Sequence, residues 1–143
     1  MKAALLVESL TGNTWQAAEH VASLLQEEHW TITGLSKVRQ PDYESIHEAD
    51  FVLVGTWVHG AFIFGQAPWA ANSIANLPAM RGKRAAAFCT FALDPGSSLD
   101  RLTRAVGETG AYVLGGVAMN RRKLEPHSEE FVARLLDAVD TAV

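Results

Sequence analysis

The sequence predicts a three-layer, doubly wound α/β fold around a five-stranded parallel sheet. Five short apolar runs alternate with helical patterns, and no linker or low-complexity run interrupts them. Apolar strands that alternate with amphipathic helices are typical of a parallel sheet covered on both faces. A length of 143 residues with 48% apolar content suits one core, so we expect residues 1–143 to form a single domain.

The first half of the chain supplies three of the strands. An apolar run predicts the first strand over Lys2–Val7, and a fully apolar run predicts the third over Phe51–Val54. The second strand is expected over Trp30–Gly34, and a short helical turn over Tyr43–Glu48. Residues at the helical period after the first strand predict the apolar face of the first helix: Thr14, Ala17, Ala18, Val21, Leu24 and Leu25.

The second half of the chain alternates in the same way. Pro68 suits the first turn of a helix, which we expect over Ala67–Leu77. The fourth and fifth strands are expected over Arg84–Cys89 and Ala111–Val117, and the last helix over Ser128–Thr141. The helix between these two strands is predicted from an apolar face of three residues: Leu99, Leu102 and Val106.

Polar residues predominate in the segment that joins the first strand to the first helix, Ser9–Thr14. Four of its six positions carry a hydroxyl or amide side chain (Ser9, Thr11, Asn13 and Thr14), and residues 3–18 contain no Lys or Arg. The N–H groups of a first helical turn, together with the helix dipole, favour an anion there. Because hydrogen bonds to a charged group are worth about 1.5–3 kcal/mol each, the segment predicts a phosphate site without an ion pair. An ordinary N-cap, with Asn13 or Thr11 capping the helix, is the alternative.

The motif Ser9-x-Thr11-Gly12-Asn13-Thr14, after an N-terminal strand and before a helix, resembles the phosphate loop of the flavodoxin family. The resemblance covers the whole chain, and no insertion divides the fifth strand, as in the short-chain form. It implies the flavodoxin-like strand order 2-1-3-4-5, with the ligand beyond the carboxyl ends of strands one and three. It also implies flavin mononucleotide (FMN) as the cofactor, with the phosphate held by Ser9, Thr11, Gly12, Asn13 and Thr14.

The segment after the third strand, Gly55–Phe62, is expected to be a loop that meets one side of the flavin ring. Such a ring needs a flat side chain against its face and backbone N–H groups along its polar edge. The resemblance aligns His59 with the family's stacking position, while Trp57 stands where the family has a smaller residue. Either Trp57 or His59 is therefore expected to cover the ring. The residues expected on this side are Thr56, Trp57, Val58, His59 and Gly60.

A second loop, beginning at Cys89, is expected to meet the other side of the ring. The family often has a tyrosine there with acidic neighbours, whereas this chain has Phe91 and a single acid, Asp94. The residues expected on this side are Cys89, Thr90 and Phe91, with Cys89 a small buried hydrophobe rather than a redox thiol. Because less negative charge penalises a reduced flavin less, we expect an easier second reduction step than in strongly acidic flavodoxins.

A basic run, Asn120-Arg121-Arg122-Lys123, follows the fifth strand at the ligand end of the predicted sheet. It is a solvated loop in one interpretation, and a docking patch for an acidic partner or an anionic reductant in the other. The formal net charge of the whole chain is −4. This balance disfavours nucleic-acid binding, which usually needs a basic excess, and it is less acidic than is typical of the family.

Several other classes of protein are excluded by what the sequence lacks. No apolar stretch reaches the length of a membrane span, and no charged leader with an apolar segment predicts a signal peptide. The single cysteine, Cys89, excludes an internal disulfide and a cysteine-based metal site, and the five histidines show no metal-ligand spacing. We therefore expect a cytoplasmic protein without a metal.

The function that the resemblance implies is electron transfer on non-covalently bound FMN. We expect a flavin reductase-type donor to supply electrons and a redox partner protein to accept them. The chain is then a carrier that needs no catalytic acid or base of its own. Two alternatives stay open: a small FMN-dependent NAD(P)H or quinone reductase, which is an oxidoreductase, and a flavin-free flavodoxin-like interaction domain.

Overall fold

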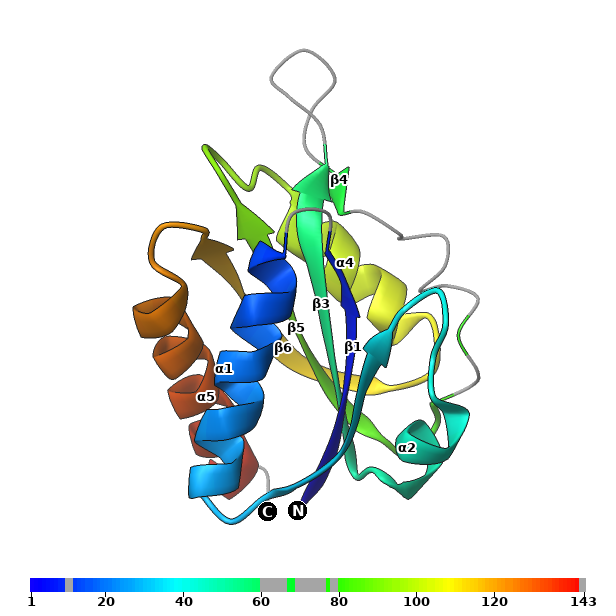
Figure 1. The fold of residues 1–143 in the computed structure, drawn as a ribbon. Coiled ribbons are helices and arrows are strands. Elements are labelled where there is room, and N and C mark those ends of the chain that lie inside the picture. The colour runs from blue at the N-terminus through cyan, green and yellow to red at the C-terminus, as the bar shows by residue number, and fades with distance from the viewer. Residues whose placement is uncertain (10–11, 60–66, 69–76, 78–79, 142–143) are drawn as a thin grey trace.

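Five parallel strands form the middle layer of the fold (Figure 1): β1 (Lys2–Glu8), β2 (Thr31–Lys37), β3 (Phe51–His59), β5 (Arg84–Phe91) and β6 (Tyr112–Asn120). Their order across the sheet is β2-β1-β3-β5-β6, so the predicted order 2-1-3-4-5 is confirmed. The computed structural model describes residues 1–9, 12–59, 67–68, 77 and 80–141.

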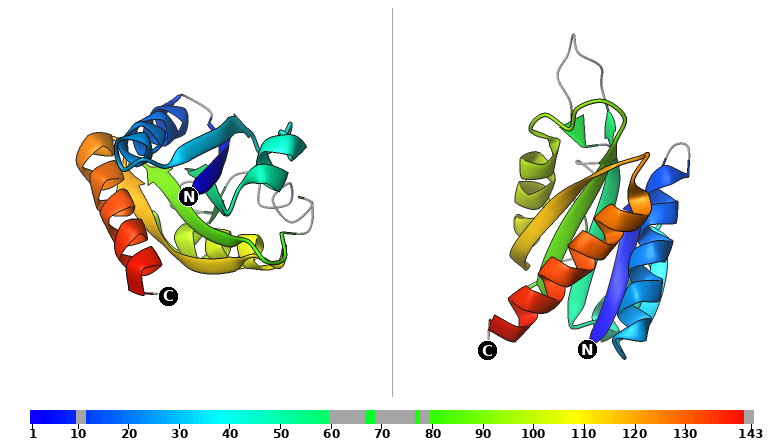
Figure 2. Two further views of the ribbon diagram at one scale, coloured as in Figure 1. Left: turned by 90° about the horizontal axis from the view of Figure 1, so that it is seen from below. Right: turned by 90° about the vertical axis from the view of Figure 1, so that its left-hand side faces the viewer.

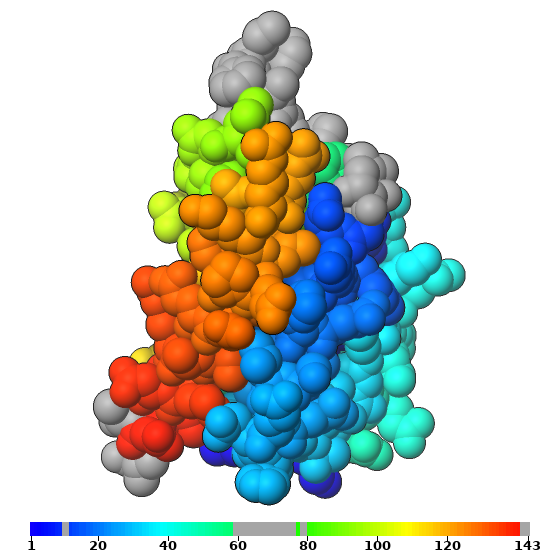
Figure 3. All heavy atoms as spheres, turned by 60° about the vertical axis from the view of Figure 1, so that its left-hand side comes forward, coloured from blue at the N-terminus to red at the C-terminus, as the bar shows by residue number. Residues whose placement is uncertain are grey.

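Helices cover both faces of the sheet, which gives the predicted three layers (Figure 2). On one face lie α1 (Asn13–Glu27) and α5 (Leu124–Thr141), and on the other lie α2 (Tyr43–Glu48) and α4 (Ser98–Gly107). Figure 3 shows α1 and α5 side by side over their face. Within the described residues, no helix combines the length and the apolar character needed to cross a bilayer.

The side chains of each strand alternate between two apolar cores, one on each face of the sheet. In β3, Phe51 and Leu53 join the core beneath α1 and α5, whereas Val52 and Val54 join the core beneath α2 and α4. This alternation follows from the period of two residues along a strand. It also explains why the buried strands are nearly continuous apolar runs, since both faces of the sheet are covered.

The structure corrects the predicted ends of the third and fourth strands. The third strand continues to His59 as β3, so residues 55–59 are strand and not the start of a loop. The fourth continues beyond its predicted end at Cys89 to Phe91 as β5, so Thr90 and Phe91 also belong to a strand. The extension of β3 pairs with the end of β5, with Thr56 opposite Cys89 and Trp57 opposite Thr90. β-branched and aromatic residues favour such strand pairing. The apolar pattern of the sequence predicted both strands too short.

The helix predicted over Ala67–Leu77 is wrong at its start. Ala67 and Pro68 form a short strand, β4, that runs antiparallel to the end of β3, with Pro68 opposite Val58. Proline is tolerated in such a position because it lies at the edge of a sheet. Residues 69–76 of the predicted helix lie outside the described residues, and Leu77 itself is not helical.

The remaining elements lie where they are expected, with shifted ends. The short helix Tyr43–Glu48 is confirmed, and the second strand begins at Thr31 and continues to Lys37. The last helix begins at Leu124, ahead of the predicted start at Ser128. Its Pro126 falls in the first helical turn, where the missing N–H has no intrahelical acceptor to lose.

Candidate functional site

A glycine stands at the N-cap position of α1. Gly12 has no side chain with which to cap the first turn, and the structure records no capping side-chain hydrogen bond from it. Its φ of 92° lies in the left-handed region that favours glycine, and a Cβ at this position would meet no atom within 4 Å. The Ser9 hydroxyl accepts a hydrogen bond from the Gly12 N–H at 3.0 Å. The space beside the Gly12 Cα is thus open at the start of α1, where an anion site would need room.

The residues predicted to bind phosphate in this segment lie in different environments. Asn13 is the first residue of α1 rather than its cap, so the plain-cap alternative fails for Asn13. Thr14 is fully buried, and its hydroxyl lies 2.7 Å from the hydroxyl of Thr90. This pair joins the first turn of α1 to the end of β5. Thr11 lies outside the described residues.

The end of β3 supplies a buried hydroxyl and an aromatic side chain. Thr56 is 0% exposed, and its hydroxyl has no hydrogen-bond partner among the described residues. Trp57 and Val58 are partly exposed. His59 is the last residue of β3, but its side chain and the whole of Gly60 lie outside the described part of the chain. The prediction that Trp57 or His59 covers a flavin ring therefore stays a prediction.

The end of β5 turns its side chains in two directions. Thr90 faces α1, whereas Cys89 is fully buried in the core beneath α4. Burial withdraws the Cys89 thiol from water and raises its pKa from 9.0 to about 12. A thiol with so high a pKa stays protonated near neutral pH and is a poor nucleophile. The expectation that Cys89 packs as a small hydrophobe agrees with this environment.

A hollow of about 220 Å³ lies between the start of α1 and the carboxyl ends of β3, β5 and β6. Parallel sheets of this kind bind ligands beyond the carboxyl ends of their strands. Five of the predicted site residues line the hollow, and two residues that were not predicted for the site join them. The lining residues are Asn13, Trp57, Val58, Thr90, Phe91, Ala92 and Arg121.

Arg121 is the lining residue that sequence reasoning assigned to a different role. It belongs to the basic run after the fifth strand, which the sequence left as a solvated loop or a docking patch. In the structure the Arg121 N–H donates to the Phe91 carbonyl oxygen at 2.9 Å. This bond holds the turn after β6 against the end of β5. Figure 3 shows the orange turn after β6 beside the blue start of α1.

A buried carboxylate at the end of β1 is also compensated at this end of the sheet. Glu8 is only 7% exposed, and its Oε1 accepts a hydrogen bond from the Arg39 N–H at 2.9 Å. Its Oε2 lies 3.7 Å from the Arg39 Nε. Because Arg39 balances this charge, Glu8 does not leave an uncompensated negative charge at the end of β1. A carboxylate ending an apolar strand was the signal in the sequence for such a pair.

A second hollow lies farther down the sheet, between β6 and α5. It measures about 190 Å³, and Gly115, Gly116 and Phe131 are among its lining residues. The charged residue that lines it, Arg134, is paired with Glu130 at 2.6 Å. The hollow lies alongside the middle of β6 and contains none of the predicted site residues. The strand-end hollow is therefore the candidate site.

Comparisons with known proteins show the family of the chain. A family model described as a flavodoxin domain matches residues 4–133 of the chain. No curated protein sequence matches it.

Three solved flavodoxins illustrate the structural similarity. A cysteine-to-serine mutant of a Pseudomonas aeruginosa flavodoxin has a TM-score of 0.73 at 19% identity, covering 98% of this chain and 99% of that one. An oxidised Bacillus cereus flavodoxin has a TM-score of 0.71 at 20% identity, covering 96% and 98%. The two-electron reduced Megasphaera elsdenii flavodoxin has a TM-score of 0.70 at 17% identity, covering 93% and 98%. At these identities the similarity shows the fold.

Proposed function

We propose, from the premise that the chain belongs to the flavodoxin domain family, that it carries electrons from a reductase to a redox partner protein. Flavodoxins bind FMN and transfer electrons with it, and this much follows from the family. We propose the identities of the site residues, of the electron donor and of the electron acceptor. The observation that supports the proposal most directly is the start of α1, where a glycine is the N-cap and Asn13 lines the strand-end hollow.

The residues at the strand ends fit FMN by two observations. The open space beside Gly12 leaves room for a phosphate at the first turn of α1. The buried hydroxyl of Thr56, without a partner among the described residues, is a polar group for which a ligand would compensate. We propose that FMN is held by the predicted set: Ser9, Thr11, Gly12, Asn13, Thr14, Thr56, Trp57, Val58, His59, Gly60, Cys89, Thr90 and Phe91.

The division of labour in this site assigns the redox chemistry to the cofactor and its positioning to the protein. Bound FMN supplies one-electron and two-electron transfer. The N–H groups of the first turn of α1 hold the phosphate, and Trp57 excludes water from one side of the ring. Thr90, held by Thr14, fixes the end of β5 on the other side. We propose the cytoplasm as the location, where a reductase would supply the electrons.

Reconstitution with FMN tests the cofactor site. Titration of the purified chain with FMN should quench the flavin fluorescence and leave a yellow protein after gel filtration. A colourless protein and unquenched flavin would refute the proposal and favour a flavin-free interaction domain.

A matched pair of variants tests the placement of the site. Thr56→Val and Ser98→Ala each remove a buried hydroxyl that has no partner among the described residues. Neither change should destabilise the protein without FMN, because an unsatisfied group is lost. Thr56→Val should weaken FMN binding about three- to tenfold, the worth of a net hydrogen bond. Ser98, the first residue of α4, should have no effect. Equal FMN affinity in both variants would remove Thr56 from the site.

Electron transfer is tested with a donor and an acceptor. The FMN-loaded chain should be reduced by NADPH only when a flavin reductase is added, and should then reduce a haem protein such as cytochrome c. Oxidation of NADPH by the loaded chain alone would instead identify it as a small FMN-dependent reductase.

A further inference from the structure

The strand-end hollow has a distinctive distribution of charge. Among the described residues that line it, Arg121 is the one charged residue, and none is a carboxylate. The segment predicted to bind phosphate contains no cation of its own. The positive charge at this hollow therefore comes from a turn far later in the chain, after β6.

The turn that presents Arg121 is held by hydrogen bonds on both sides of this residue. The Arg121 N–H donates to the Phe91 carbonyl oxygen at 2.9 Å. Before it, the Asn120 N–H donates to His127 Nδ1 at 2.9 Å. After it, the Arg122 N–H donates to Asn120 Oδ1 at 2.9 Å. The backbone from which the Arg121 side chain extends is thus fixed relative to β5 and α5.

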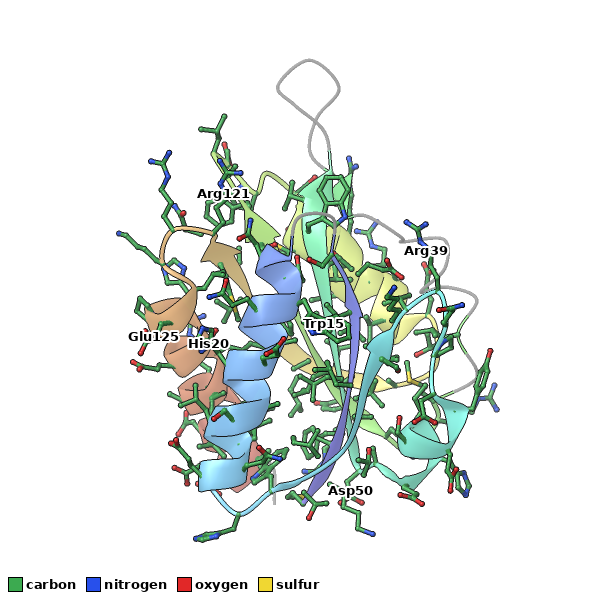
Figure 4. All side chains as sticks on the ribbon, viewed as in Figure 1. Trp15, His20, Arg39, Asp50, Arg121 and Glu125 are labelled. Carbon is green, nitrogen blue, oxygen red and sulfur yellow. The ribbon has the colours of Figure 1, made fainter. Side chains whose placement is uncertain are left out.

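Arg121 also differs in its pairing from Arg39, a cation at the same end of the sheet. Arg39 balances the buried carboxylate of Glu8. Arg121 forms no ion pair with any residue that the structure describes. Figure 4 labels both residues at the strand-end side of the molecule, with Arg121 beyond β6 and Arg39 beyond β2. The charge of Arg121 is therefore available to an anionic ligand in the hollow.

We infer that Arg121 is the counter-ion of the cofactor phosphate and gives the chain its preference for FMN over riboflavin. This inference rests on the proposed function. The phosphate is the expected partner because Asn13 lines the same hollow. As the first residue of α1, Asn13 marks the positive end of the helix dipole. A guanidinium suits a phosphate because its fork of N–H donors matches two of the oxygens.

The adjacent arginine provides a matched control. Arg121 and Arg122 are both exposed and carry the same charge, but Arg122 does not line the hollow. Arg121→Ala and Arg122→Ala are titrated with FMN and with riboflavin at low and high salt. Arg121→Ala should weaken FMN binding about tenfold or more at low salt, the range for a charge-assisted hydrogen bond. It should leave riboflavin binding unchanged, and its loss of FMN affinity should be smaller at high salt. Arg122→Ala should leave both affinities close to those of the wild type, and Arg121→Lys should recover part of the FMN affinity.

The outcomes separate this inference from the proposed function. If the wild-type chain binds no flavin, the proposed function itself fails. If the wild type binds FMN but the two alanine variants weaken it equally, Arg121 contributes only to the general field and the inference fails. Equal losses for FMN and riboflavin in Arg121→Ala would likewise refute a contact with the phosphate. Unchanged melting temperatures of the variants without FMN serve as the check on folding.

Discussion

The hydroxyl pair between Thr14 and Thr90 should be strongly coupled in stability. The two oxygens lie 2.7 Å apart in the interior, with Thr14 0% and Thr90 4% exposed. Replacing one threonine by the isosteric valine leaves the other hydroxyl buried without this partner, which costs about 1–3 kcal/mol. Replacing both removes both polar groups and should be nearly neutral. The coupling energy from the double-mutant cycle should therefore equal the sum of the two single losses, about 2–6 kcal/mol.

Urea unfolding of the four proteins without FMN measures this coupling. Flavin is omitted because a ligand that binds only the folded state adds its own stabilisation. Thr14→Val and Thr90→Val should each lower the unfolding midpoint at an unchanged m-value, and the double variant should recover most of the loss. Additive single effects, equal to the double effect within about 0.5 kcal/mol, would refute the reasoning. The two hydroxyls would then not depend on each other in the folded state.

Three further predictions follow from the packing of the sheet. Gly55→Ala should destabilise by about 1–3 kcal/mol in urea unfolding, because its Cβ would lie 2.2 Å from the buried Phe88 ring; Gly107→Ala, with its nearest atom at 3.8 Å, is the neutral control. Burial raises the pKa of Cys89 from 9.0 to about 12, so between these two pH values only the unfolded chain loses the thiol proton. The free energy of unfolding should therefore fall with rising pH, by up to about 1.4 kcal/mol per pH unit more than in Cys89→Ala. Parallel plots of unfolding free energy against pH for the two proteins would contradict this. In hydrogen exchange without FMN, residues 55–57 should be protected because they pair with β5; rapid exchange would favour the loop first expected.

The number of strands was predictable because burial on both faces leaves an unbroken apolar run in each strand, whereas their order was implied by the resemblance to the flavodoxin family. Phe51–Val54 is such a run, and it forms the middle of β3. The strand ends were not predictable in the same way. Thr56 and Trp57 extend β3 because they pair with Cys89 and Thr90 of β5. That pairing joins residues far apart in the sequence, and a local pattern contains no signal for it.

The candidate site shows the same limit. The prediction of an anion site rests on polar residues and a glycine between a strand and a helix, which is a local signal. Nothing in the run Arg121-Arg122-Lys123 indicates which cation lines a ligand site. The choice depends on the hydrogen bond from the Arg121 N–H to Phe91, which forms only when β6 pairs with β5. The placement of Arg121 is thus a property of the assembled sheet.

The charges near the hollow also explain how an acidic chain can bind a phosphate ester. A net charge of −4 repels an anionic ligand as a whole. Close to the site, however, Glu8 is balanced by Arg39, and Arg121 adds a positive charge. Salt screens the distant charges more than the close ones. Raising the salt concentration should therefore weaken the general repulsion strongly and weaken the attraction between Arg121 and the phosphate less. Because the two effects oppose each other, the FMN affinity of the wild type should change less with salt than the affinity of a site that binds phosphate through exposed lysines alone. The Arg121→Ala variant loses the close attraction to the guanidinium but keeps the general repulsion, so its FMN affinity should rise with salt.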